Sequence, residues 1–140
     1  MSKFDRDLRK YFQPIDFSSE CAITAGGSMT ATGETIQHAY YIHIGFMVWF
    51  SLYATTITTG GTAANSIRAS LPSACPPSVD AILEAGAYRD ASSGPSVAGQ
   101  AFIATSTDTV DIFKEDGSNY GLGSGRLVLA SGWYITDVIG

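Results

Sequence analysis

The strongest constraint on this chain lies between Tyr40 and Leu52, where every even-numbered residue is apolar. Apolar side chains at every second position favour a β-strand with one buried face, because successive side chains of a strand point to opposite faces. Gly45 interrupts the run and predicts a tight turn or a bulge. The odd-numbered positions also carry large side chains. We therefore expect the second face to be covered as well. Contact with another subunit is the preferred interpretation, although Tyr41, Trp49 and Tyr53 could equally stack on sugar rings. The residues expected at this interface are Tyr41, Met47, Trp49 and Tyr53.

Other segments repeat the alternation over shorter lengths. Residues 66–72 predict a strand with Ile67, Ala69 and Leu71 inward, and residues 101–113 predict a hairpin around a Thr-Ser-Thr-Asp turn. Residues 126–139 predict a last strand with a bulge at Gly132, whereas 79–88 leave a helical turn or a short strand open. Only 15% of the residues are charged, and the chain contains 15 glycines. The chain is therefore expected to form an all-β, jelly-roll-like antiparallel sandwich.

The N-terminus has a different pattern. Residues 2–13 predict a short amphipathic helix that ends before Pro14, with one apolar stripe and one charged face. A helix this short needs a surface to lie on, either its own β domain or another protein. We interpret residues 1–35 as a docking arm and 36–140 as the β domain. The docking side chains are expected to be Phe4, Leu8, Tyr11, Phe12, Ile15 and Phe17.

Charge and cysteine content limit the partners and the compartment. The net charge is −5 and no segment concentrates Lys or Arg, which argues against nucleic acid as a partner. Cys21 and Cys75 are interpreted as two buried free thiols, because two cysteines supply no disulfide framework. We also expect no signal peptide, and the apolar run from Ala39 to Ala54 is too short and too polar to span a membrane. Synthesis and assembly in a reducing cytoplasm follow as the expectation.

No arrangement of residues predicts catalysis, a metal or a cofactor. The two histidines, His38 and His43, lie five residues apart and so on opposite faces of one strand. No serine lies in a nucleophile elbow, and no compact Cys or His cluster is present. Asp108 and Asp111 are interpreted as solvated turn residues rather than as a glycosidase pair. We therefore expect a protein that is not an enzyme.

Taken together, several motifs resemble the small β jelly-roll domains of tailed-bacteriophage structural proteins. A Tyr-x-x-Ile-Gly-x-x-Val hairpin corresponds to Tyr41, Ile44, Gly45 and Val48, and it precedes an Ile-x-x-x-Leu-Pro strand at 67–72. A final Ser-Gly-x-Tyr strand corresponds to residues 131–134. The resemblance covers residues 36–140.

The resemblance implies a homotrimeric protein of the virion surface, assembled in the cytoplasm of the bacterial host. Its arm would dock onto a major capsid, neck or tail protein, as in a capsid decoration protein or a head appendage. The alternative implied by the same resemblance is a tail fibre protein that binds a glycan or another receptor on the host. In that case, the loops at 55–65, 92–99 and 115–125 would form the distal tip.

Overall fold

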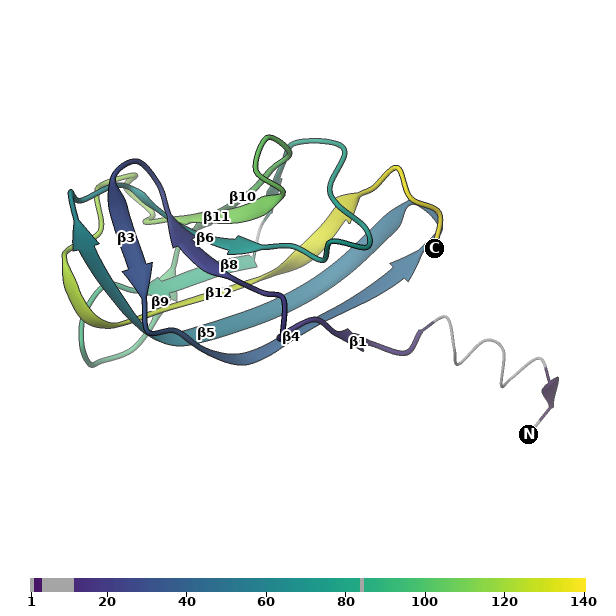
Figure 1. Ribbon diagram of the computed structural model, residues 1–140, viewed down its shortest axis with the longest axis horizontal. Coiled ribbons are helices and arrows are strands. Elements are labelled where there is room, and N and C mark those ends of the chain that lie inside the picture. Colours follow the sequence, from purple (N-terminus) through teal and green to yellow (C-terminus); the bar gives the residue numbers. More distant parts are fainter. Residues whose placement is uncertain (1, 4–11, 84) are drawn as a thin grey trace.

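The structure is a computed structural model that describes residues 2, 3, 12–83 and 85–140. It forms two antiparallel β-sheets that pack face to face (Figure 1). The first sheet has seven strands in the order β1-β4-β5-β12-β8-β9, with β3 also paired to β5, and the second has the order β2-β6-β11-β10-β7. The strands of the first sheet are β1 (Ile15–Asp16), β3 (Met29–Thr32), β4 (Thr35–Ile44), β5 (Met47–Gly61), β8 (Ala85–Arg89), β9 (Val97–Ala98) and β12 (Gly123–Ile135). Those of the second sheet are β2 (Ile23–Ala25), β6 (Ser66–Ser70), β7 (Ala81–Leu83), β10 (Gln100–Ala104) and β11 (Thr109–Phe113). The expected all-β fold with two packed antiparallel sheets is confirmed.

The long alternating segment folds into the β4–β5 hairpin. Gly45 and Phe46 form a two-residue turn between Ile44 and Met47. Gly45 has φ 59°, which a glycine adopts without steric cost at the first central position of such a turn. The expected turn at Gly45 is therefore confirmed, and the hairpin supplies two neighbouring strands of the first sheet, β4 and β5.

The two-residue turn reverses which side chains point inward. Tyr41 pairs with Phe50 and Ile42 pairs with Trp49, so odd residues of β4 share a face with even residues of β5. Paired residues of antiparallel strands point to the same face. The prediction that one face carries all even positions from 40 to 52 is therefore wrong for β4. Beyond the turn, the buried residues are even-numbered as expected, since Val48, Phe50 and Leu52 are inaccessible to solvent or nearly so.

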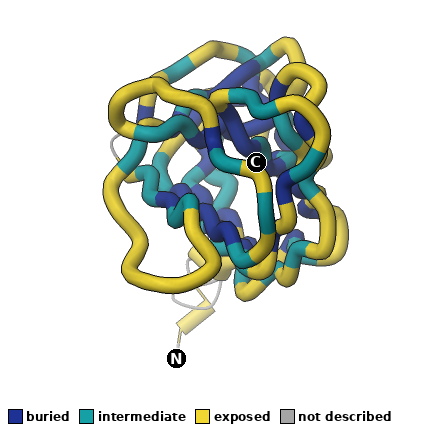
Figure 2. The backbone as a smooth tube through the Cα atoms, turned by 90° about the vertical axis from the view of Figure 1, so that its left-hand side faces the viewer, coloured by how far each residue is buried: buried dark blue, intermediate teal, exposed yellow. Residues whose placement is uncertain are grey.

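The core lies between the two sheets. Figure 2 shows buried backbone in the middle of the molecule and exposed backbone in the peripheral loops. The expected inward residues of the second sheet, Ile67, Ala69 and Leu71, are buried. The 101–113 hairpin forms as β10 and β11, with Ala101 and Ile103 buried and Phe102 only partly buried. The largest fully buried side chains are Tyr120, Phe50, Leu52, Ile57, Ile67, Ile103 and Ile112.

The segment from Ile15 to Thr35 belongs to the sandwich. β1 pairs with β4, β2 with β6 and β3 with β5, so each of the three short strands extends or reinforces a sheet. Phe17, Ile23 and Met29 are buried in the core. The predicted boundary at residue 35 is therefore wrong, because these apolar side chains are needed to close the space between the sheets. The predicted helix at 2–13 lies mostly outside the described residues.

Two further expectations are now resolved. Residues 79–88 form the short strands β7 and β8, and the described residues there include no helical turn. The predicted bulge at Gly132 is wrong, since the register shifts of β12 lie between Gly123 and Val128. Gly132 instead allows close packing, because a Cβ there would lie 3.0 Å from a methyl carbon of Leu83.

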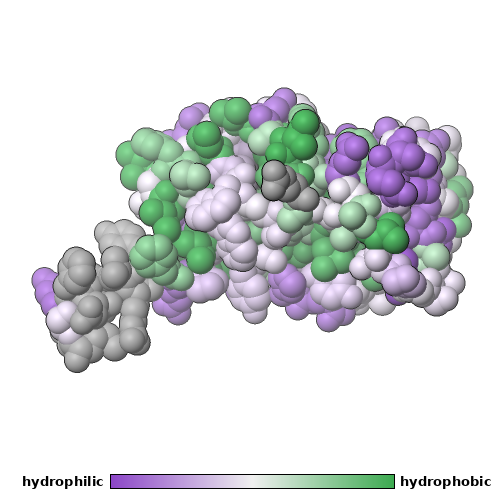
Figure 3. Space-filling view, turned by 180° about the vertical axis from the view of Figure 1, so that it is seen from behind, coloured by the Kyte–Doolittle hydropathy of each residue, from purple (hydrophilic) through white to green (hydrophobic). Residues whose placement is uncertain are grey.

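The elongated molecule has two different ends (Figure 1). We call them the hairpin end, with the Gly45–Phe46 turn, and the loop end, with the loops 62–65, 90–96 and 114–122. The C-terminus lies at the hairpin end, where the Gly140 amide donates to the Gly45 carbonyl over 2.8 Å. Seen from behind, hydrophobic side chains gather toward the hairpin end and hydrophilic ones toward the loop end (Figure 3). Among the described residues, no helix has the length and apolar character to cross a membrane.

Candidate functional site: the outer face of the seven-stranded sheet

The first sheet presents to the exterior a face that no other part of the described chain covers, which we call the outer face. Strand pairing arranges its side chains in four rows across β4, β5, β12 and β8. Rows one and two, nearest the hairpin end, consist of large apolar residues. Row three is made mostly of small residues, and row four is mixed. In order, the rows are Ile44–Met47–Ile135, Ile42–Trp49–Trp133, Tyr40–Ser51–Ser131–Ala85 and His38–Tyr53–Leu129–Ala87.

Rows one and two form an apolar patch together with Phe46 of the turn. Phe46, Met47, Trp133 and Ile135 are each about half exposed, with exposed fractions of 48–51%. No Asp, Glu, Lys or Arg occurs from Thr35 to Gly61 or from Leu127 to Thr136. Depletion of charge together with Trp, Met and Phe is the composition of an interface core. This apolar patch therefore has the composition of a protein interface.

The four residues predicted at the subunit interface separate in the structure. Met47 and Trp49 lie in the apolar patch, and Tyr53 lies on the same face two rows away. Tyr41 is buried, 8% exposed, and its ring packs edge-on against Phe17 with centroids 5.8 Å apart. Tyr41 was predicted on the wrong face because the turn at Gly45 reverses the alternation. It is a core residue.

Sequence reasoning assigned only Met47 and Trp49 of the apolar patch to an interface. It missed Ile42, Ile44 and Phe46 of the hairpin, and Trp133 and Ile135 of β12. The last two lie far along the chain from the hairpin, and the pairing Trp133–Trp49 and Ile135–Met47 places them beside it. Alternation around the buried Tyr134 could have predicted that both point away from the core. No local pattern indicates which strand β12 pairs with.

Row three forms the floor of a trough that runs across the strands. Trp49 and Trp133 border it on one side, and Tyr53 and Leu129 border it on the other. Two adjoining hollows of about 240 and 420 Å³ lie along it and share His38 and Ser51 in their lining. The imidazole Nε2 of His38 lies 3.0 Å from the Ser51 hydroxyl, and the His38 ring stacks on Tyr40.

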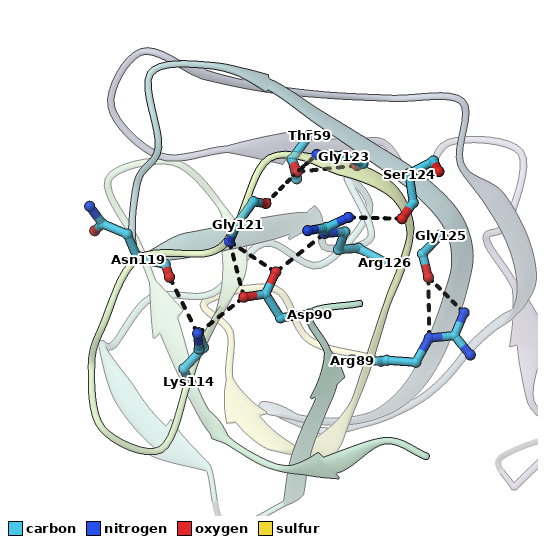
Figure 4. Close-up of polar contacts among 10 residues, drawn as sticks. All are labelled: Thr59, Arg89, Asp90, Lys114, Asn119, Gly121, Gly123, Ser124, Gly125 and Arg126. Carbon is cyan, nitrogen blue, oxygen red and sulfur yellow. Dashed lines mark hydrogen bonds and ion pairs between the residues drawn. The ribbon is translucent and has the colours of Figure 1, made fainter. Parts of the chain in front are cut away.

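The loop end is held together by one partly buried carboxylate, that of Asp90 (Figure 4). Asp90 accepts hydrogen bonds from the Gly121 amide at 3.0 Å, from Lys114 Nζ at 3.0 Å and from Arg126 Nε at 3.2 Å. Thr59 donates to the Gly121 carbonyl over 2.7 Å and accepts from the Gly123 amide. These bonds fix the 114–122 loop to strands β5 and β12. The cluster is a structural staple, because each charged group in it has an opposite partner.

The candidate catalytic residues do not form a site. The two histidines lie on opposite faces of β4 as predicted: His38 lies on the outer face, and His43 Nε2 lies 2.8 Å from the Val138 carbonyl oxygen. No group of three or more His, Cys, Asp or Glu side chains in the described part of the chain could hold a metal ion. Asp108 lies in the predicted turn with φ 54°. Asp111, however, is 5% exposed rather than solvated, and it accepts hydrogen bonds from Arg68 and Thr109.

Both cysteines are free and buried, as predicted. Burial raises the pKa of the Cys21 thiol to about 11, with smaller contributions from Glu34 and Glu20. Burial also raises the pKa of the Cys75 thiol, whose sulfur lies 3.8 Å from the Tyr134 hydroxyl. Thiols whose pKa is raised are weak nucleophiles at neutral pH, because only the thiolate reacts.

The predicted docking residues fall into three groups. Phe4, Leu8 and Tyr11 lie outside the described residues. Phe12 and Ile15 are about half exposed, 55% and 49%, and are available to a partner. Phe17 is 3% exposed and its amide donates to the Ala39 carbonyl, so its prediction as a docking residue is wrong. Comparison of the chain with protein-family models, with curated proteins and with solved structures finds no match in any of the three.

Proposed function

We propose that this chain is a non-enzymatic structural protein of a tailed-bacteriophage virion, a surface appendage or capsid decoration protein. In this proposal it assembles as a homotrimer through the apolar patch, and its N-terminal segment docks onto a capsid, neck or tail protein. The observation that carries the proposal is the uncharged apolar patch, which includes Phe46, Met47, Trp49, Trp133 and Ile135. The trimeric state and the virion context rest on the resemblance of the hairpin and final-strand motifs.

The placement of the N-terminal segment supports attachment at the hairpin end. Ile15 pairs with Tyr41, four residues before the turn, so the chain enters the sheet near the apolar patch. Phe12 and Ile15 are exposed there. A partner at this end would reach the N-terminal segment while leaving the loop end free. Three arms on one trimer would add avidity that a single arm lacks.

Light scattering coupled to size-exclusion chromatography tests the interface. We expect wild-type protein to have the mass of a trimer, and Trp133→Ser to raise the subunit dissociation constant by about 30-fold, the cost of truncating one interface tryptophan. Ile82→Ser is the matched control, because Ile82 is 81% exposed but lies on the other sheet. A monomeric wild type, or equal loss of assembly in both variants, would contradict the proposal.

Co-sedimentation with particles tests docking. Removal of residues 2–13 leaves β1 and Phe17 in place and is expected to abolish binding to virions while the trimer persists. Binding that survives this truncation would show that the segment is not the docking element.

A receptor-binding tail fibre protein is the second candidate. The loops 90–96 and 114–122 lie at the loop end, away from the entry of the N-terminal segment, and Asp90 at the start of one loop bonds to Lys114 and Gly121 of the other (Figure 4). A cross-linked loop cluster distant from the attachment point is suited to contact a host surface. Adsorption of virions to host cells in competition with the purified protein separates this candidate from a purely structural role.

A further inference from the structure

The trough beyond the apolar patch has a composition of its own. Its floor is made of small side chains, because row three places Ser51, Ser131 and Ala85 side by side on three neighbouring strands. The neighbouring rows are lined by larger groups, which rise on both sides of that floor. Four strands about 4.8 Å apart give the trough a length of about 14 Å. It is thus a transverse groove in a sheet face, long enough for an extended ligand.

The groove combines aromatic rings with hydroxyl groups. The first hollow is lined by Pro14, His38, Tyr40, Trp49 and Ser51, and the second continues past Ser131 to Ala85 and Leu129. Trp and Tyr offer flat apolar surface together with a polar edge. Serine hydroxyls can both donate and accept hydrogen bonds. A ligand that fits must therefore present apolar faces and a rim of hydroxyl groups at the same time.

Among the described residues that line the two hollows, none is charged. Asp16 lies at one end of the groove, because it pairs with Tyr40 and paired residues of antiparallel strands point to the same face. An anionic ligand would lose hydration in the groove and meet this carboxylate without gaining a counter-charge. The groove therefore disfavours an anionic ligand, and the uncharged lining of the two hollows suits a neutral one.

We propose that the trough is a binding site for a neutral oligosaccharide. Sugar rings would stack their C–H faces on Trp49 and Tyr40, while Ser51, Ser131 and the imidazole of His38 would hydrogen-bond to the sugar hydroxyls. This site lies on the flank of the sandwich, not at the loop end. The site shares Trp49 with the apolar patch, whereas its other contacts, in rows three and four, lie outside the rows that assembly uses.

Tryptophan fluorescence gives a direct readout. The chain has two tryptophans: Trp49 lines the first hollow, and Trp133 pairs with Trp49 in the neighbouring row. We would titrate the full-length protein with neutral pentasaccharides of glucose and of N-acetylglucosamine, up to about 10 mM. Saturable change in emission with at least one of them supports the site. No saturable change with either, or an equal change with an anionic galacturonate pentasaccharide, would overturn it.

Variants separate binding in the trough from binding elsewhere. Ser131→Leu fills the floor, and Tyr40→Ala removes one stacking surface; each is expected to weaken binding at least 10-fold. Phe102→Ala is the matched control, since Phe102 lines a hollow on the other sheet, and it should bind as wild type does. Equal weakening in all three would place the ligand outside the trough.

The remaining candidate occupant is a second copy of the chain. Ser131→Leu would then break the assembly measured by light scattering, and saccharide would not compete. That result would overturn the proposed saccharide site, but it would not contradict the proposal that the chain forms an oligomer. Loss of assembly in Trp133→Ser alone, with saccharide binding kept, would leave both proposals standing.

Discussion

Asp90 shows how one side chain can organise a whole end of the molecule. Its two carboxylate oxygens accept hydrogen bonds from a lysine, an arginine and a backbone amide, and its side chain is 14% exposed. Removing the charge leaves Lys114 and Arg126 partly buried without a counter-charge. An unpaired charge in such a place costs more than the lost bonds alone.

We predict that Asp90→Asn lowers the free energy of unfolding by about 2 kcal/mol, because it weakens charge-assisted hydrogen bonds. Urea denaturation measures this, and hydrogen exchange of the Gly121 amide should accelerate. Asp116→Asn is the control, since Asp116 is an exposed turn residue that bonds only locally to Ser118. Similar losses in the two variants would show that the staple contributes nothing specific.

Cys21 makes stability depend on alkaline pH. Burial raises the pKa of its thiol to about 11, above the value of 9.0 for an exposed thiol. Between these values the unfolded chain has lost the proton and the folded chain retains it, so stability falls as pH rises, by about 1.4 kcal/mol per pH unit for this group.

We therefore predict that the stability difference between wild type and Cys21→Ala narrows from pH 8 to pH 11. At pH 8 both states keep the thiol protonated, and the variant is destabilised only by the lost packing. Thermal unfolding at each pH measures the difference. A difference that stays constant over this range would contradict the raised pKa.

At the scale of the element, the turn at Gly45 decides which side chains of β4 enter the core. Gly45 has φ 59°, and a Cβ at that position would meet no atom within 4 Å. The position is therefore restricted by backbone conformation and not by space. Residues with a branched Cβ are strained in this conformation, whereas Asn tolerates it.

We predict that Gly45→Val costs about 1–2 kcal/mol of stability, the penalty of a left-handed conformation, and that Gly45→Asn costs less than half of that. Urea denaturation of both variants gives the comparison. If the two substitutions cost the same, side-chain crowding rather than backbone strain limits this turn.

For the whole molecule, the sandwich begins at β1 and not after residue 35. Residues 15–35 pair with both sheets and bury Phe17, Cys21, Ile23 and Met29. Loss of these four buried apolar side chains would lower the free energy of unfolding by several kcal/mol. That is a large part of the stability of a domain of this size.

We predict that a chain starting at residue 14 unfolds cooperatively near the wild-type temperature. A chain starting at residue 36 is expected to lack a cooperative transition. Calorimetry of the two truncations measures this. A folded, cooperative protein from residue 36 onward would restore the boundary that the sequence indicated.

Local patterns in the sequence determined the fold class and most of the strands. Alternation placed Val48, Phe50, Leu52, Ile67 and Ala69 in the core, because period-two patterns depend only on neighbouring residues. Gly45 marked its turn for the same reason. Composition also indicated the uncharged body of the protein.

The tertiary structure decided what depends on pairing between distant strands. The two-residue turn moved Tyr41 into the core, and β12 brought Trp133 beside Trp49. β2 and β3 joined the sheets although their segment is rich in small residues, because strand partners supply the hydrogen bonds that a local sequence does not reveal. The trough exists only because Ser51, Ser131 and Ala85 come from three strands in register. Register across a sheet is a property of the assembled fold, and no single segment encodes it.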